Sequence, residues 1–375
     1  MEEQRRIRLE RLLDEFDRLG IGRQVNYGKL HLYSIITHST ALEGSTVTVE
    51  ENTVMFDDGL PPAGRPVAEQ LMNLDLKRAY EVTEEVATAR TEITLPLLRA
   101  FSSLVMRNTG VLYRTPRGEY DEARGDLRLQ NVSAGRGGRS YLSWEKVEPR
   151  TNDFIVWLNE RLASIGSMAA PDIYDLSFEA HFRLVTIHPW SDGNGRVARL
   201  VMNLVQMEGG VVPTAVRSDH KVQYIEALRE SQEAGASERF LEFMADELID
   251  ALSQTVEEYA RDIERDVPWL RDDDSNVPST PQVTPQVTPQ VTPQVTPQVT
   301  LQVKRLLATL GSKELDAREL RGLLGLSDAK SFRQLYLRKA IDAGLVEMTI
   351  PDKPHSRNQR YRLTRLGMKV NETLG

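Results

Sequence analysis

The chain has 375 residues, of which 40% are hydrophobic and 27% charged, and its formal net charge is -8. This length predicts at least two domains, and the composition is that of an ordinary soluble protein. The absence of cysteine excludes disulfides and Cys-ligated zinc. No apolar run approaches roughly 18 residues and the start is too charged for a secretory segment, so we expect no membrane partner. The absence of cysteine fits a cytoplasmic setting.

In chain order, helical periodicity comes first. Apolar residues recur on one helical face from Leu9 to Leu19, and the pattern stops at Gly20 and Gly22. Further such patterns run over residues 67–86, 97–105, 154–162, 176–185, 197–207 and 224–248. This succession predicts a fold that is mainly α, with a helical core.

One segment departs from the helical pattern. Residues 126–147 alternate over Leu127 and Leu129, pass through a glycine-rich tip at 135–138 and resume at Tyr141 and Leu142. Alternation around a glycine-rich turn is typical of a β-hairpin, although it also occurs in ordinary surface hairpins without a function.

A linker follows the helical part. Five copies of Pro-Gln-Val-Thr occupy residues 281–300, after the acidic stretch RDDDSNVPST. A proline at every fourth position excludes a helix and favours an extended chain of up to roughly 60 Å. We therefore predict an N-terminal region at 1–64, a core domain at 65–265, a linker at 266–300 and a separate domain at 301–375.

The last domain differs in charge from the rest. Residues 301–375 carry 15 Lys and Arg against 8 Asp and Glu, whereas residues 1–300 carry 32 against 47. Helical patterns at 303–310, 320–324 and 330–343 precede two short strand patterns, VEMTIP and QRYRLT. Three helices and a two-stranded wing predict a winged helix-turn-helix domain, whose basic charge suits an anionic partner or a solvated surface.

The stretch HPWSDGNGR, residues 188–196, holds the groups best suited to chemistry. It lies between two amphipathic patterns, so a helix N-terminus would follow its small residues and offer unpaired N–H groups to a phosphate. Arg196 and Arg199 would project from the first turn, where both can reach one anion. Asp192 could hold Mg²⁺ or cap a turn, and His188 could act as a general base or as a capping histidine.

The longer stretch HPWSDGNGRVAR resembles the signature of the Fic family, with Trp190 in place of the usual phenylalanine. The resemblance covers about residues 65–250 and implies transfer of AMP from ATP to a Ser, Thr or Tyr hydroxyl of a target protein. It also implies a base at His188, a Mg²⁺ ligand at Asp192 and the hairpin at 126–147 as a flap over the target segment. The implied nucleotide-binding residues are Gly193, Asn194, Gly195, Arg196 for the γ-phosphate, Arg199 for the phosphate chain, and Tyr224 for adenine unless it is a core tyrosine.

An upstream stretch gains meaning from this signature. Residues 39–44, STALEG, fit the inhibitory pattern of Fic proteins, with Ser39 and Glu43 on one face of a helix at about residues 30–44 and Gly44 ending it. We predict that Glu43 pairs with Arg196 and thereby inhibits the protein. In some relatives the same glutamate supports removal of AMP, and the sequence leaves that activity open here.

Other functions stay open at this point. One is a nucleotide-responsive DNA-binding regulator that acts through the basic residues of 301–375, with DNA or a second protein as partner. Another keeps the fold but transfers phosphate, phosphocholine or UMP. Self-modification is expected, and a homodimer is a further alternative. The basic residues concerned are Lys330, Arg333, Arg338, Lys339, Lys353, Arg357, Arg360 and Arg362.

Overall fold

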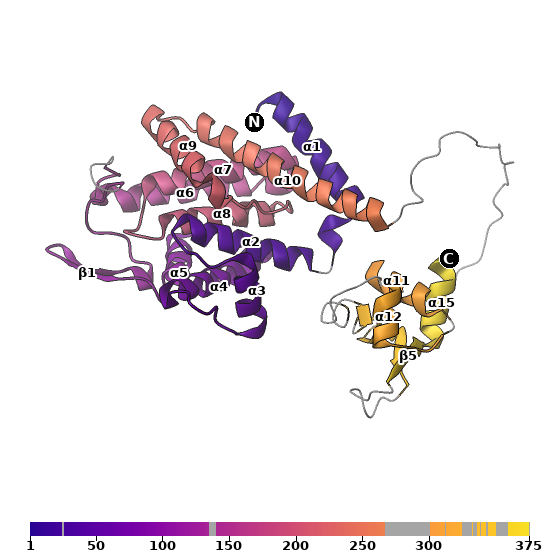
Figure 1. The fold of residues 1–375 in the computed structure, drawn as a ribbon. Coiled ribbons are helices and arrows are strands. Elements are labelled where there is room, and N and C mark those ends of the chain that lie inside the picture. The colour runs from indigo at the N-terminus through magenta and orange to yellow at the C-terminus, as the bar shows by residue number, and fades with distance from the viewer. Residues whose placement is uncertain are drawn as a thin grey trace. The chain divides into compact units, whose positions relative to one another are not determined.

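The computed structural model describes residues 1–24, 26–134, 140–266, 301–311, 313–324, 332, 336–337, 339–342, 344–349 and 359–374. The chain divides into two compact units, Met1–Asp272 and Asp273–Gly375 (Figure 1). The predicted linker repeats lie outside the described residues. Each unit is considered by itself below.

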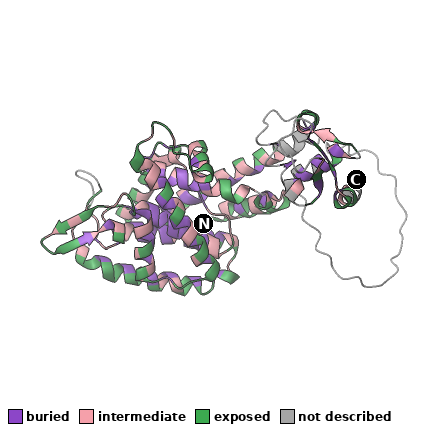
Figure 2. Cartoon of the chain, turned by 90° about the horizontal axis from the view of Figure 1, so that it is seen from below, coloured by how far each residue is buried: buried purple, intermediate pink, exposed green. Residues whose placement is uncertain are grey.

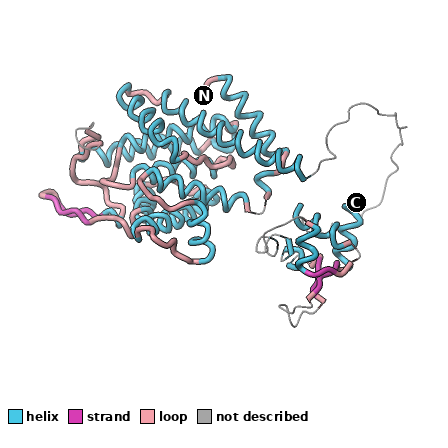
Figure 3. Tube along the Cα trace, in the orientation of Figure 1, coloured by secondary structure: helices cyan, strands magenta, loops and turns pink. Residues whose placement is uncertain are grey.

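The first unit consists almost entirely of helices (Figure 3). They are α1 (Glu3–Arg18), α2 (Tyr27–Leu42), α3 (Val49–Asp58), α4 (Val67–Ala89), α5 (Leu95–Val105), α6 (Val147–Leu162), α7 (Ala170–Ile187), α8 (Asn194–Glu208), α9 (Lys221–Ala234) and α10 (Glu238–Asp266), with short 3-10 turns between them. The predicted mainly helical fold is confirmed. The pattern at 224–248 is two helices, because α9 ends at Gly235 and α10 begins at Glu238.

Helix α8 lies at the centre of this unit. It packs against α7, α4, α5 and α2, and nearly all of its residues are buried. Figure 2 shows this buried interior between the surrounding helices. One apolar cluster joins α4 to α8, and a second joins α1, α9 and α10 to the opposite side of α7 and α8. Helix α8, which begins six residues after His188, is therefore packed between two apolar clusters.

The strands of the first unit lie upstream of the predicted hairpin. Strands β1 (Leu112–Thr115) and β2 (Gly118–Asp121) pair antiparallel with Thr115 opposite Gly118, and the hairpin projects from the helical body (Figure 1). The β-hairpin predicted at 126–147 therefore differs from the structure, in which the paired strands of this region lie at 112–115 and 118–121. The described residues of that segment contain one isolated antiparallel bridge, between Ser133 and Ser140, and the tip at 135–139 is outside the described part.

The arms of the 126–147 segment are joined by backbone contacts next to the tip and by one side chain further along. Beside the bridge, the Tyr141 N–H donates to the Val132 carbonyl at 3.0 Å. The Arg128 guanidinium donates to the carbonyl of Gln130 at 2.9 Å and to that of Leu142 at 2.5 Å. A guanidinium carries several donors in a fixed fork and can satisfy carbonyls that strand pairing would otherwise satisfy. Arg128 thus holds the second arm at Leu142, and outside the bridge the described residues 126–143 contain no strand.

The second unit is a small mixed domain. Its described elements are α11 (Leu301–Leu310), β3 (Leu315–Asp316), α12 (Ala317–Leu323), α14 (Lys339–Asp342), β4 (Val346–Met348), β5 (Arg360–Leu363) and α15 (Arg365–Leu374). The antiparallel sheet has the order β3-β5-β4, so the two predicted strands are joined by a third. Much of the predicted third helix at 330–343 lies outside the described residues, and the winged-helix assignment stays a prediction.

Candidate active site

The loop from His188 to Gly193 connects α7 to α8. His188 ends α7 in the left-handed region with φ 56°, and Gly193 precedes α8 with φ 80°. A Cβ on Gly193 would lie 2.8 Å from Met106 Sδ, so both the backbone angle and the space require glycine. The loop therefore leads from His188 directly to the start of α8, whose first N–H groups have no partner within the helix.

Asn194 and Trp190 fix this loop to itself. The Asn194 amide donates to the Trp190 carbonyl at 2.9 Å and its oxygen accepts from the Trp190 N–H at 3.1 Å. The Trp190 ring is fully buried and its Nε1–H donates to the Gly125 carbonyl at 3.2 Å. The side chain of Asn194, expected in the anion cradle, is thus occupied within the loop, and what it leaves for an anion is its backbone N–H.

Arg128 fixes the same loop from outside. Its side chain is buried and its Nε donates to the His188 carbonyl at 2.8 Å, while its backbone N–H donates to the Pro189 carbonyl at 3.1 Å. Arg128 lies 60 residues before His188, and no local sequence signal connects the two positions. It is a positioning residue that the sequence did not indicate.

The His188 imidazole is neutral at physiological pH. Burial lowers the pKa of His188 to about 4, against a smaller opposing effect of its contact with the Val185 carbonyl. Nδ1 lies 3.3 Å from that carbonyl, so a proton on Nδ1 leaves Nε2 as the acceptor. The ring stacks on Tyr141, with centroids 3.7 Å apart. A neutral imidazole with a free acceptor nitrogen is the form that can take a proton.

Asp192 is the exposed carboxylate of the loop. Its Oδ1 accepts from the Gly193 N–H at 2.6 Å, its Oδ2 lies 3.8 Å from Arg196 Nη2, and its side chain is 63% exposed. Among the described residues no group of three His, Asp or Glu side chains could hold a metal ion. Mg²⁺ beside a polyphosphate needs only one or two carboxylates, so this exposed oxygen pair fits the predicted role.

A second carboxylate lies near Asp192. Glu122 is 1% exposed; its Oε2 accepts from the Val111 N–H at 2.9 Å, whereas its Oε1 has no hydrogen-bond partner. Burial raises the pKa of Glu122, and the charge of Asp192 adds to that effect. The sequence did not single out Glu122, because the strand pairing that brings it to the loop was not predicted.

Arg196 extends toward the end of α5. It is 1% exposed, and its guanidinium donates to the Val105 carbonyl at 3.3 Å and to Met106 Sδ at 3.1 Å. Its Nε is buried without a partner. Burial lowers the pKa of Arg196 against the opposing charges of Asp192 and Glu43. This arginine is therefore buried with few acceptors, which suits it to bind an anion.

Arg199 is the partner of Glu43. Its Nη2 donates to Glu43 Oε1 at 2.6 Å and to the Ser39 carbonyl at 2.9 Å, and its Nε donates to Ser39 Oγ at 2.8 Å. The prediction that Glu43 pairs with Arg196 is therefore wrong, because Glu43 pairs with Arg199. The reason lies in the helix geometry: Arg199 projects toward α2, whereas Arg196 projects toward α5.

Glu43 is placed against the start of α8. Helix α2 ends at Leu42, Glu43 caps it, and Gly44 follows with φ 105°. A Cβ on Gly195 would lie 2.6 Å from Glu43 Oε1, so the absence of a side chain there lets the carboxylate approach the helix N-terminus. Burial would raise the pKa of Glu43, but Arg199, and at longer range Arg196, lower it below the usual value.

Tyr224 contacts the same arginine. It is 4% exposed; its hydroxyl accepts from Arg199 Nη1 at 3.3 Å and lies 3.0 Å from His181 Nε2. The ring is also part of the second apolar cluster. Tyr224 is thus both a core residue and a support for Arg199, and the fully buried His181 behind it is a contact that the sequence did not indicate.

The basic residues of the second unit are only partly described. Arg362 donates to Glu347 Oε1 at 2.7 Å and to Glu314 Oε1 at 3.0 Å, and Arg360 donates to the Glu314 carbonyl at 3.0 Å. The side chains of the six other basic residues named for DNA binding lie outside the described part. Nothing in the described part of this unit favours DNA over a protein partner.

Two family models match parts of this chain. Residues 92–206 match the Fic/DOC family, and residues 301–364 match the C-terminal domain of Fic-like "filamentation induced by cAMP" proteins. The protein adenylyltransferase fic-1 of Caenorhabditis elegans is 26% identical over 220 residues, and the protein adenylyltransferase Fic of Aedes aegypti is 25% identical over 221. Each alignment covers 58% of this chain but only 40% and 39% of the relative.

Solved structures with the same fold include two bacterial proteins. A Fic family protein from Desulfovibrio desulfuricans aligns with a TM-score of 0.50 and 24% identity over 96% of both chains. A Fic-domain signalling protein from Bacteroides thetaiotaomicron aligns with a TM-score of 0.56 and 20% identity, over 68% of this chain and 97% of its own. No described helix is long and apolar enough to cross a membrane. The chain carries a Fic/DOC family domain and, beyond residue 300, a Fic-like C-terminal domain.

Proposed function

We propose that this protein is an adenylyltransferase that moves AMP from ATP to a Ser, Thr or Tyr hydroxyl of a target protein. The observation that carries the proposal is the loop at 188–193, where a neutral His188 lies beside the α8 N-terminus and its two buried arginines. The relatives named adenylyltransferases support it, although this chain spans about 40% of their length.

In this proposal His188 accepts the proton of the target hydroxyl as that oxygen attacks the α-phosphorus. The bond from the α-phosphorus to the bridging oxygen breaks, and pyrophosphate leaves with that oxygen. The backbone N–H groups at the start of α8 and the guanidinium of Arg196 hold the phosphates. Transfer then depends on positioning and charge stabilisation, as is general for phosphoryl chemistry.

A divalent cation held by Asp192 would neutralise phosphate charge in the same site. The segment at 126–147 is proposed to hold the target chain beside His188, because its second arm places Tyr141 on the imidazole. Self-modification offers a target that is always present for assay.

Autoinhibition belongs to the same proposal. The carboxylate of Glu43 occupies Arg199 and lies over Gly195, at the place where the phosphate chain would meet the start of α8. Glu43 then competes with ATP for the guanidinium of Arg199 and for the space beside Gly195. As a result, the resting protein holds ATP in an unproductive pose. The same carboxylate is positioned to support removal of AMP, which is a further activity to be assayed.

The experiment uses ATP labelled separately at the α and γ positions. We expect protein-bound α label and free labelled pyrophosphate, both absent in His188→Ala. A matched control is His220→Ala, since His220 pairs with Glu247 away from the loop. Protein-bound γ label would mean a kinase, and α label that persists in His188→Ala would overturn the role of His188.

A further inference from the structure

The end of α2 is fixed by a buried amide on α4. Asn73 is fully buried, and its Oδ1 accepts from Thr40 Oγ1 and from Asn52 Nδ2, each at 2.8 Å. Its Nδ2 donates to Ser45 Oγ at 3.1 Å and to the Glu69 carbonyl at 2.8 Å. Both donors of this side chain are therefore in use, and its oxygen accepts from Asn52 and shares the single Thr40 hydroxyl proton with the carbonyls of Ile36 and Thr37.

Two of the residues that contact Asn73 flank Glu43 in the sequence. Thr40 lies three residues before Glu43 and Ser45 lies two residues after it. Both are buried, so the chain is held on each side of a carboxylate that itself remains partly exposed. Two fixed points this close leave Glu43 little freedom to leave Arg199.

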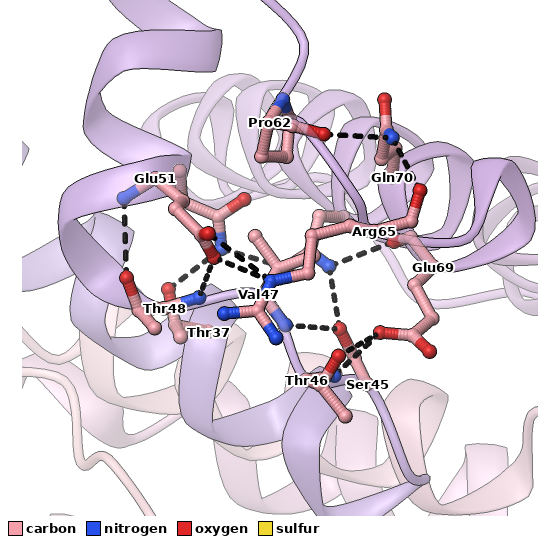
Figure 4. Close-up of polar contacts among 12 residues, drawn as sticks. Thr37, Ser45, Thr46, Val47, Thr48, Glu51, Pro62, Arg65, Glu69 and Gln70 are labelled. Atoms are coloured by element: carbon pink, nitrogen blue, oxygen red, sulfur yellow. Dashed lines mark hydrogen bonds and ion pairs between the residues drawn. The ribbon is translucent and has the colours of Figure 1, made fainter.

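The network continues into α3 and the loop before it. Asn52 Nδ2 also donates to Thr37 Oγ1 at 2.8 Å, which ties α3 to the previous turn of α2. Glu69 accepts from the backbone N–H of Thr46 at 2.6 Å and from its hydroxyl at 2.8 Å. Figure 4 shows these contacts around Thr37, Ser45, Thr46 and Glu69. The segment after Glu43 is thus held at two successive residues.

The helix that carries Asn73 is also fixed to the helix that carries Arg199. Two turns after Asn73, the Tyr80 hydroxyl donates to Asn203 Oδ1 on α8 at 2.6 Å, and Asn203 lies one turn after Arg199. All of these side chains are buried. The position of Glu43 and the position of Arg199 are therefore set by one pair of packed helices, α4 and α8.

We propose that Asn73 is a positioning residue for inhibition, which holds the α2 end so that Glu43 stays on Arg199. The inference rests on the proposed function, because it concerns the control of that site. Every polar atom of the Asn73 side chain is paired, whereas Asn52 Oδ1 beside it has no partner. Buried polar groups favour the arrangement that pairs them, since displacement removes a contact that water cannot replace in the interior. Removing Asn73 should therefore free the α2 end without touching His188, Arg196 or Arg199.

The test uses the full chain and ATP labelled at the α position. In Asn73→Leu we expect self-modification to rise by about fivefold or more, in the range of a typical coupling between sites. In the Glu43→Gly background the same change should add nothing, because the group that it positions is gone. Thr40→Val, which removes one hydroxyl of the network at constant shape, should give a smaller rise.

Asn159→Leu is the matched control. The Asn159 side chain also makes two contacts, at 3.0 and 2.8 Å, but with the backbone of Ile93, away from α2. It should lose stability without gaining self-modification, which separates positioning from general loosening. Thermal unfolding of each variant identifies any that fails to fold, and Thr40→Val then carries the test.

Hydrogen exchange gives a second readout that needs no activity. Amides of residues 37–46 should exchange faster in Asn73→Leu and at the unchanged rate in Asn159→Leu. If Glu43→Gly raises self-modification and Asn73→Leu does not, or if the two effects multiply, the role of Asn73 is overturned. If Glu43→Gly itself has no effect, autoinhibition fails, whereas unchanged exchange at 37–46 overturns the role of Asn73 independently.

Discussion

The two arginines of α8 stand in contrasting surroundings. Arg196 donates to one carbonyl and one sulfur and has a buried Nε without a partner, whereas Arg199 donates to Ser39, Glu43 and Tyr224. Burial lowers the pKa of Arg196; it would lower that of Arg199 too, but Tyr224 and Glu43 outweigh it and raise that pKa. One arginine is short of acceptors and the other is already satisfied.

These different surroundings give the two arginines different responses to an anion. A buried guanidinium with few acceptors gains from any anion that reaches it, because its desolvation is already complete. A satisfied guanidinium binds an anion only when another partner leaves. On the proposed function, Arg196 can bind the γ-phosphate without losing another anionic partner. Productive binding of the phosphate chain is opposed by the ion pair of Arg199 with Glu43.

The largest expected effect is that of removing His188, which is proposed to take part in proton transfer and not in anion binding by the two arginines. His188→Ala should lower AMP incorporation by about 10²–10⁴-fold, the usual contribution of a general base. The structure of the anion site should persist, so binding of ATP, measured by calorimetry, should stay within a few-fold. Loss of ATP binding together with activity would place His188 in the binding site rather than in proton transfer.

The contrast itself is tested by Arg196→Met and Arg199→Met. The first should lower incorporation by about a hundredfold or more, through loss of a positioned cation, without lowering Tm. The second should lower Tm, because the acceptors on Ser39 and Glu43 lose their donor. Equal falls in Tm would show that the two surroundings do not differ as their contacts indicate.

Glu43→Gly should raise self-modification by about tenfold, equivalent to about 1.4 kcal/mol of relieved competition. Glu43→Gln keeps the shape and removes the charge, and should give a smaller rise. Initial rates at several ATP concentrations check whether the change lies in productive binding. A fall in both variants would mean that Glu43 assists transfer instead of opposing it.

The pH dependence of the rate tests the protonation states of His188 and Glu43 without a substitution. The neutral form of His188 prevails above its pKa of about 4, so the rate should hold from pH 8 to pH 5 and fall only as the pH approaches that value. Because the pKa of Glu43 lies below its usual value, its pair with Arg199 is also kept over that range and lost only in stronger acid. A rate that falls near pH 6.5 would contradict the burial of His188.

The smallest effect is expected at His181. His181→Phe removes the nitrogen 3.0 Å from the Tyr224 hydroxyl and should raise the KM for ATP by about two- to fivefold, the scale of one hydrogen bond, with kcat little changed. His181→Gln should restore part of the loss, since an amide can replace that contact. A change confined to kcat would argue against support of Arg199 through Tyr224.

Both the helical class and the loop proposed for the chemistry are predictable from the sequence. Periodicity located the helices because each buries one face, and nine contiguous residues hold His188, Asp192 and Arg196 with their spacing. The sequence also predicted Ser39 and Glu43 on one face of a helix, and in the structure Ser39 lies in the last turn of α2 and Glu43 is its C-cap.

Which arginine pairs with Glu43 depends on how the helices pack. Arg196 and Arg199 are one turn apart, and the packing of α2 and α5 on different sides of α8 directs one to each. It likewise supplied Arg128, His181 and Asn73, whose partners are distant in sequence and leave no local pattern. Short-range periodicity encodes a face and a turn, whereas the contacts that hold a buried charge depend on how whole helices pack.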